Sequence, residues 1–101
     1  MSQEAGDASR EQPVPLAARI LLALAQELKA RGDETAAVPL SRLSKILGES
    51  ASVLMREITL MSDAQIGAQR GPGWVRLQQD ESRWLVLLTP AGRALLDEGA
   101  R

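Results

Sequence analysis

Cysteine and histidine are both absent from this chain of 101 residues. Their absence excludes disulfide bridges, thiolate nucleophiles, imidazole bases and the common zinc sites. A nucleophilic serine would need a lysine or a carboxylate as its base, and no serine stands in a G-x-S-x-G context. The sequence therefore predicts a protein that is not an enzyme and that holds no metal ion and no cofactor.

Aromatic residues and long apolar runs are also scarce. Trp74 and Trp84 are the only aromatic side chains, so the core must consist of Leu, Ile, Val, Ala and Met, a composition that favours helices. With 45% hydrophobic residues, a chain of this length supports one domain. The longest purely apolar run, residues 20–25, is too short to cross a bilayer. We expect a soluble, cytoplasmic protein without a membrane partner.

An excess of positive charge is missing as well. The 12 basic and 13 acidic residues give a net charge of −1, so the chain as a whole has no attraction for a polyanion such as DNA. The charges are unevenly distributed, because residues 40–79 contain five basic and three acidic residues. The acidic excess lies outside this middle segment.

A helix is predicted over residues 15–31. Residues 1–13 are polar and lack apolar periodicity, which predicts a disordered tail before a single domain at residues 14–99. After the tail, apolar residues recur at every fourth position, namely Leu16, Ile20, Leu24 and Leu28. Gly32 supplies a stop signal. A second apolar row lies beside the first and consists of Ala17, Leu21, Leu22 and Ala25. The helix is therefore either wrapped by its own domain or meets a second subunit with its outer side.

Two further helices are predicted on either side of residues 48–50. Ser41 is the expected N-cap of the first, and Gly48 is expected to end it. Ser50 is the expected N-cap of a longer helix that extends to about residue 63. The inner side of that helix is marked by Leu54, Ile58 and Met61.

Extended structure is predicted after Ala64, where the period of apolar residues changes. Residues 74–79 alternate between apolar and polar side chains, which is typical of a strand with one buried face. Residues 84–88 are apolar on both faces, as expected for a strand that has a neighbour on each edge. The sequence places that strand between residues 36–38 and residues 74–79.

Two turn signals leave the tip of the hairpin open. "GPG" at residues 71–73 and "DES" at residues 80–82 both interrupt the extended segments. The first position would give a tip flanked by arginines, and the second an acidic tip that phosphates repel. Beyond the hairpin, Thr89 as N-cap and Pro90 at the first helical position predict a short last helix.

The order of these elements is that of a winged helix-turn-helix, an α+β, mainly α fold with three helices, a β-hairpin wing and a short C-terminal helix. "LSKILGESASVLMREITLMSDAQI", residues 43–66, resembles the helix-turn-helix of ArsR- and MarR-type bacterial transcription regulators. "LLTPAGRALLDE", residues 87–98, is similar to the segment that follows their wing. The resemblance extends over residues 15–98 and implies double-stranded DNA as the partner.

The resemblance also implies which residues contact DNA. The outward side of the recognition helix is expected to present Ser50, Ser52, Met55, Arg56 and Thr59. Arg56 is the strongest of these, because an arginine can donate to both major-groove acceptors of guanine or to a phosphate. The DNA backbone is the expected target of Arg42 and Lys45, and the wing is expected to use Arg70 and Arg76. Glu49 and Glu57 reduce the positive charge of this surface.

The sequence thus predicts a sequence-specific DNA-binding regulator that acts as a homodimer, since two copies can read a palindrome. The dimer interface is expected at Leu22, Leu95 and Leu96. The alternative is a winged-helix module that binds other proteins and has lost DNA binding, which the weak charge favours. The sequence identifies no effector ligand.

Overall fold

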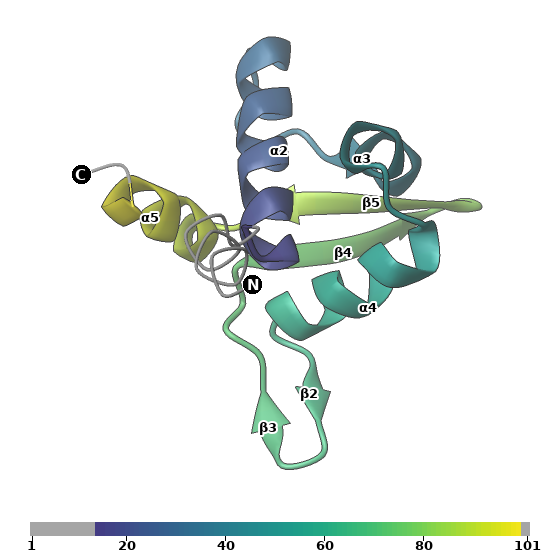
Figure 1. The fold of residues 1–101 in the computed structure, drawn as a ribbon, viewed down its shortest axis with the longest axis vertical. Coiled ribbons are helices and arrows are strands. Elements are labelled where there is room, and N and C mark those ends of the chain that lie inside the picture. Colours follow the sequence, from purple (N-terminus) through teal and green to yellow (C-terminus); the bar gives the residue numbers. More distant parts are fainter. Residues whose placement is uncertain (1–13, 100–101) are drawn as a thin grey trace, which may run out of the picture.

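The computed structural model describes residues 14–99, which form an α+β fold with four helices and a small antiparallel sheet (Figure 1). The predicted tail, residues 1–13, lies outside the described residues. The elements are α2 (Leu16–Arg31), β1 (Val38–Pro39), α3 (Leu40–Leu47), α4 (Ala51–Met61), β2 (Gln65–Ile66), β3 (Gln69–Arg70), β4 (Val75–Asp80), β5 (Arg83–Leu88) and α5 (Pro90–Gly99).

Helix α2 ends where the sequence pattern predicts and begins one residue later than predicted, with Pro15 as its N-cap. The row of apolar residues at every fourth position faces inward, and Ile20, Leu24 and Leu28 are fully or almost fully buried. Gly32 ends the helix in the left-handed conformation, with φ 69°, which glycine adopts without steric cost. Lys29 and Arg31 in the last turn stabilise the helix because their positive charges offset the partial negative charge of its C-terminus.

The start of α3 differs from the prediction. The helix begins at Leu40 with Pro39 as its N-cap, so Ser41 lies inside the helix and caps nothing. The reason is that β1 leads directly into α3: Pro39 pairs with Leu85 in the sheet and its φ of −60° already suits the entry to a helix. The end of α3 is as predicted, because Gly48 takes φ 68° and donates its N–H to the Ser44 carbonyl at 2.9 Å.

Helix α4 has the predicted N-cap and is two residues shorter than predicted. The Ser50 hydroxyl accepts a hydrogen bond from the Val53 N–H at 3.2 Å. The helix ends at Met61 because Ser62 turns the chain: its hydroxyl donates to the Thr59 carbonyl at 2.7 Å and accepts from the Ala64 N–H at 3.1 Å. The predicted inner side is confirmed, since Leu54, Ile58 and Met61 are buried.

The sheet has the predicted strand order, with β5 between β1 and β4. Val38 pairs with Val86 on one edge of β5, and Val75 pairs with Leu88 on the other. The hairpin of this sheet turns between Asp80 and Arg83, which decides between the two predicted tips in favour of residues 80–82.

A second hairpin, formed by β2 and β3, was not predicted. It turns at residues 67–68 and extends away from the body of the molecule beyond the end of α4 (Figure 1). Each of its strands has two residues, which is too short to show an alternating pattern. Residues 71–73 are therefore a connection from this hairpin to β4 and do not form the tip of either hairpin.

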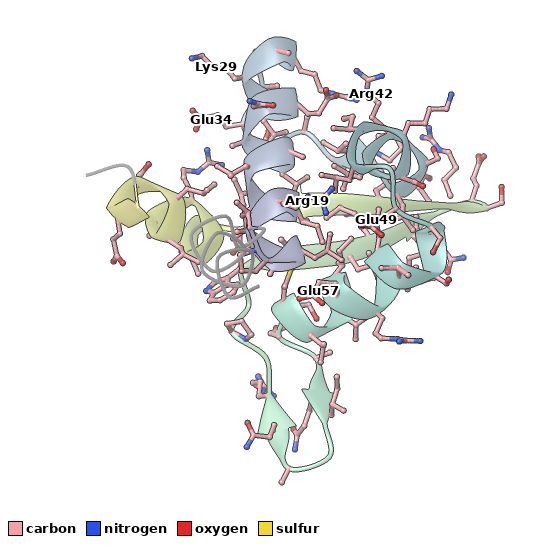
Figure 2. The ribbon with its side chains drawn as sticks, viewed as in Figure 1. Arg19, Lys29, Glu34, Arg42, Glu49 and Glu57 are labelled. Carbon is pink, nitrogen blue, oxygen red and sulfur yellow. The ribbon has the colours of Figure 1, made fainter. Side chains whose placement is uncertain are left out.

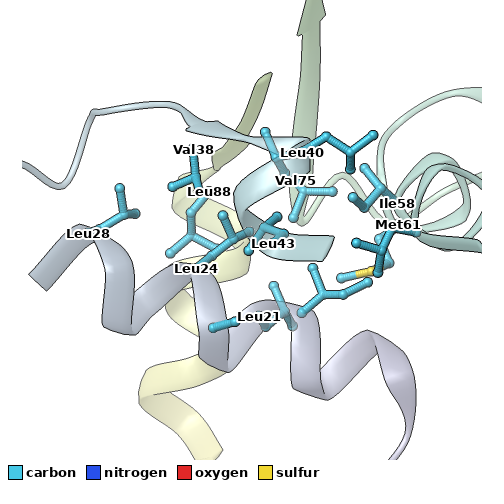
Figure 3. Packing of buried hydrophobic residues seen from close by; sticks show 14 residues of the cluster. Leu21, Leu24, Leu28, Val38, Leu40, Leu43, Ile58, Met61, Val75 and Leu88 are labelled. Atoms are coloured by element: carbon cyan, nitrogen blue, oxygen red, sulfur yellow. The ribbon is translucent and has the colours of Figure 1, made fainter. Parts of the chain in front are cut away.

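The core lies where α2, α3 and α4 meet one face of the sheet. Figure 3 shows Leu24 of α2 and Leu43 of α3 among the side chains of Val75 and Leu88 from the sheet. Each fully buried leucine or isoleucine contributes about 2 kcal/mol through removal from water. Within the described part of the chain, no helix combines the length and the apolar character that crossing a membrane requires.

Candidate nucleic-acid interface

Helix α4 keeps one face free of contact with the core, and Arg56 is at the centre of that face. The three buried residues of α4 define its inner side, and Arg56 lies on the opposite side of the helical wheel. Ser52 and Leu60, four residues before and after it, are also exposed. Glu57 is half-buried and lies off this face. The predicted position of Arg56 therefore agrees with the structure.

Met55 and Thr59, which the prediction places on the outward side, are less exposed than Ser52 and Arg56. Met55 is half-buried and packs against the core. Thr59 is half-buried as well, and its hydroxyl donates to the Met55 carbonyl at 2.7 Å. Met55 borders the inner side of α4, whereas Thr59 is nearer to Arg56 on the helical wheel. The outward face is narrower than the resemblance implies.

The serines at the start of α4 have local partners. Ser50 is the N-cap, and its hydroxyl lies 3.4 Å from the hydroxyl of Ser52. The Ser50 oxygen already accepts from the backbone, whereas Ser52 stays exposed and has no role in the cap. Apart from its contact with Ser50, the Ser52 hydroxyl is therefore available to a ligand.

The two basic residues of α3 differ in their surroundings. Arg42 forms a two-pronged contact with Glu27 of α2, with Nε–Oε1 at 3.2 Å and Nη2–Oε2 at 3.3 Å. The hydrogen bond from Arg42, supported by the charges of Arg42 and Arg31, lowers the pKa of the Glu27 carboxyl below its ordinary value, although partial burial opposes this shift. Lys45 is exposed and has no carboxylate within ion-pair distance among residues 14–99.

Arg19 of α2 holds the turn between α3 and α4, a role that the sequence did not predict. Its Nη2 donates to the Leu47 carbonyl at 2.8 Å, and its Nη1 lies 3.3 Å from Glu49 Oε2. Figure 2 shows Arg19 reaching from α2 toward Glu49. The guanidinium thus satisfies a carbonyl at the end of α3 and neutralises an acidic residue next to the free face of α4.

The tip of the β4–β5 hairpin is acidic. Asp80 and Glu81 are exposed there, and Arg83 lies 3.5 Å from Asp80. Glu81 takes φ 58°, a conformation that costs about 1–2 kcal/mol for a side chain other than glycine. Of the two tips that the sequence left open, this hairpin therefore has the acidic one.

The predicted wing arginines lie in two different hairpins. Arg76 is near the start of β4, four residues before Asp80, which places it about 13 Å from the tip. Arg70 is in β3, in the second hairpin. Both are exposed. Neither belongs to the tip of β4–β5, because residues 71–73 are not a hairpin turn.

A groove between α2 and α5 contains all three leucines of the predicted dimer interface. Leu22, Leu95 and Leu96 line it together with Ala18, Leu21 and Gly99, around a volume of about 390 Å³. Leu22 exposes 51% of its surface to solvent. An apolar side chain so exposed, next to further leucines, is typical of a surface that a partner covers.

No protein-family model matches the chain, and neither a curated protein nor a solved structure matches it. Among residues 14–99, no three His, Cys, Asp or Glu side chains gather where they would hold a metal ion. The comparisons therefore assign neither a family nor a function to the chain.

Sequence reasoning did not predict the roles of Arg19 and Glu27, and it did not predict the second hairpin. Arg19 and Glu27 contact residues 30 and 15 positions away in the chain. A local pattern carries no signal for such distant partners. The sequence contained one weak signal for the second hairpin. Gly67, a residue type that favours turns, stands between Gln65–Ile66 and Gln69–Arg70.

Proposed function

We propose that this protein is a sequence-specific DNA-binding transcription regulator with a winged helix-turn-helix fold, which acts as a homodimer. The observation that carries the proposal is the free face of α4, centred on Arg56. In this proposal α3 and α4 form the helix-turn-helix, and β4–β5 is the wing. Helix α4 enters the major groove, whose width of about 12 Å admits one helix with its side chains.

The construction of the turn supports this role. Gly48 ends α3 in the left-handed conformation, and Arg19 bonds both sides of the turn through Leu47 and Glu49. A recognition helix needs such support, because base contacts require side chains to be held within a fraction of an ångström. The ion pair also removes the net negative charge that Glu49 would otherwise bring close to the phosphates.

The positive charge of α3 and α4 is sufficient only for a modest affinity of a single copy of the protein for DNA. Glu27 holds Arg42 and Asp80 holds Arg83, so Lys45 and Arg56 are the cations of α3 and α4 without an internal partner among the described residues. Each phosphate contact strengthens binding through counterion release, and the two free cations of α3 and α4 in one copy give few such contacts. A homodimer doubles them and adds the requirement for a palindrome.

A second candidate function is a protein-interaction module of the same fold. The observation that favours it is the apolar character of the α4 surface beside Arg56: Val53 and Leu60 expose 41% and 50% of their surfaces. Two apolar residues seven positions apart on one helix face are a common anchor for a protein groove. The acidic tip of β4–β5 also fits a protein partner better than a phosphate backbone.

The experiment that separates the two functions is selection from a random pool of DNA duplexes by the purified protein at low salt, followed by sequencing of the retained duplexes. Enrichment of an inverted repeat supports the dimeric regulator. If the folded protein retains no duplex above background, the DNA-binding proposal is wrong, and the apolar surface of α4 becomes the site to test against protein partners.

The matching mutation is Arg56→Ala, tested on the selected duplex. We expect it to weaken binding by about 1–3 kcal/mol and to relax preference at one base position in each half-site, because the guanidinium reads a base edge. Lys29→Ala is the control, since it removes one exposed positive charge at the far end of α2. Equal base preference of Arg56→Ala and the unmodified protein would exclude Arg56 as a base contact.

A further inference from the structure

The hairpin formed by β2 and β3, residues 65–70, is a projection without an evident role in the fold; we name it the arm. All six of its residues are exposed, and none belongs to the core. It leaves the body directly after α4 and points away from both the sheet and α2 (Figure 1). A projection that does not pack on the core is expected to serve a contact outside the molecule.

The base of the arm is built to hold it in a fixed direction relative to α4. Three backbone hydrogen bonds connect the two legs: Gly71 N–H to Ala64 carbonyl at 3.1 Å, Gly73 N–H to Ser62 carbonyl at 3.1 Å, and Trp74 N–H to Met61 carbonyl at 2.8 Å. Any side chain at Gly71 would overlap the Ser62 carbonyl oxygen, so the legs approach as closely as only glycine permits.

A further hydrogen bond fixes the return leg of the arm to the sheet. The hydroxyl of Thr89, at the end of β5, donates to the Gly73 carbonyl at 2.6 Å. The arm is therefore anchored at the end of α4 and at the sheet, and its position follows that of the recognition helix.

The charge of this segment differs from that of the rest of the chain. Residues 64–79 contain two arginines, four glutamines and no acidic residue, and no other stretch of the sequence without Asp or Glu is as long. In the arm, Gln65 and Arg70 are cross-strand partners and therefore lie on the same face. The tip consists of Gly67 and Ala68, whose small size allows close approach to another surface. The tip of β4–β5, in contrast, carries Asp80 and Glu81.

We propose that the arm is a second DNA-contacting element, which binds the duplex outside the base pairs that α4 reads. This inference rests on the proposed function. Arg70 contacts phosphates and Gln65 a neighbouring phosphate or base edge, while the tip reaches about 10 Å beyond the base. A two-stranded ribbon of this kind fits a DNA groove, and the lack of acidic groups removes the repulsion that the β4–β5 tip would meet.

A shallow hollow beside the arm is partly apolar, unlike the polar face that carries Gln65 and Arg70. Leu60 and Ile66 line this hollow of about 230 Å³ together with Gln69, Arg70 and Pro72. Half of the surface of Leu60 is exposed. If a protein partner bound the arm, this hollow would be its contact, and DNA affinity would not depend on the arm. The experiment distinguishes the two cases.

The structure permits a clean shortening of the arm. The Gly71 N–H donates to the Ala64 carbonyl, which is the bond that closes a two-residue turn. Replacing residues 65–70 with Asn-Gly, the preferred sequence of such a turn, removes the arm and keeps its base. Arg70→Ala is the second variant, because it removes one exposed side chain and leaves the hairpin in place. Lys29→Ala is the charge-matched control.

The affinity of each variant for the duplex selected by the unmodified protein is measured at several salt concentrations, together with a hydroxyl-radical footprint. We expect the shortened variant to bind about tenfold or more weakly and to leave the flank of each half-site unprotected, with the preferred sequence under α4 unchanged. Arg70→Ala is expected to reduce the slope of log K against log salt by about one for each phosphate that its guanidinium neutralises.

Failure of this inference is distinguishable from failure of the proposed function. If the unmodified protein selects a duplex and both variants bind it with unchanged affinity and footprint, the arm does not contact DNA and the regulator proposal stands. If the unmodified protein selects no duplex, both proposals are wrong. Should the shortened variant fail to fold, as judged by circular dichroism, the footprint of Arg70→Ala alone decides whether the arm protects the flank.

Discussion

Gly92 in the first turn of α5 is a residue at which two distant parts of the chain come into close contact. It is the one buried residue of the helix, and a Cβ built on it would overlap the Trp74 carbonyl and lie 2.8 Å from Leu88 Cδ1. The same Trp74 carbonyl accepts the Thr89 N–H at 3.1 Å, so it has little freedom to move. The glycine of "TPAGR" thus has a packing reason, independent of any ligand.

Gly92→Ala is expected to lower the free energy of unfolding by about 2–3 kcal/mol, because the added methyl group meets a fixed carbonyl and not a flexible side chain. Gly99→Ala is the control, since nothing lies within 4 Å of a Cβ at that position. The measurement is urea unfolding followed by circular dichroism. A Gly92→Ala protein as stable as the Gly99→Ala control would mean that α5 can shift away from Trp74.

At the scale of elements, α2 organises both helices of the proposed DNA-binding unit. Arg19, near its start, holds the turn between α3 and α4, and Glu27, two turns later, holds Arg42 of α3. Arg31 adds a weaker contact to Glu27 at 3.6 Å. Polar contacts on one helix thus fix the orientation of α3, and through the turn that of α4, beyond what the apolar core provides.

The Glu27 contact gives a pH dependence of stability whose sign follows from its lowered pKa. The carboxylate is stabilised in the folded state, so its contribution is complete above the pKa of the unfolded chain and is lost as pH falls through the lower pKa of the folded state. We expect Glu27→Gln to be less stable than the unmodified protein near about pH 7 and the difference to vanish toward about pH 3.

Urea unfolding of both proteins across this pH range is the measurement, with Glu98→Gln as the control for the loss of one exposed carboxylate on α5. If the difference in unfolding free energy between Glu27→Gln and the unmodified protein stayed constant from neutral to acidic pH, packing of the side chain, and not its charge, would hold α2 to α3.

On the scale of the whole molecule, the groove between α2 and α5 is lined by no residue of α3 or α4. The sequence pattern of α2 left open whether its outer side is covered by the domain itself or by a second subunit. Leu22 is half exposed and lines the groove with Leu95 and Leu96. The domain does not cover this side, which favours the second interpretation.

Leu22→Glu is therefore expected to convert a dimer into a monomer without loss of secondary structure, because two-fold symmetry places the new charge twice in an apolar interface. Sedimentation velocity at several protein concentrations measures the change. Ile46→Glu is the matched control, since Ile46 is also an exposed apolar helix residue, with 41% exposure, and lies on α3 outside the groove. Sedimentation of the unmodified protein as a monomer at high concentration would remove the dimer from the proposed function.

The sequence by itself determined those features that depend on neighbouring residues. The apolar period and Gly32 defined α2, the hydroxyls of Ser50 and Thr89 marked two helix starts, and the continuous apolar run at residues 84–88 placed β5 in the middle of the sheet. The same period oriented Arg56 away from the core. Local sterics and side-chain periodicity are sufficient for these features.

Only the tertiary structure decided the features that depend on residues far apart in the chain. The entry of α3 at Leu40 follows from the pairing of Pro39 with Leu85, and Arg42 is held by Glu27 from another helix. The half-burial of Met55 and Thr59 depends on how closely α4 packs on its neighbours. The arm can form because Gly71 and Gly73 approach the backbone at the end of α4 closely. The glycines are visible in the sequence, but a local pattern does not show which backbone groups they approach.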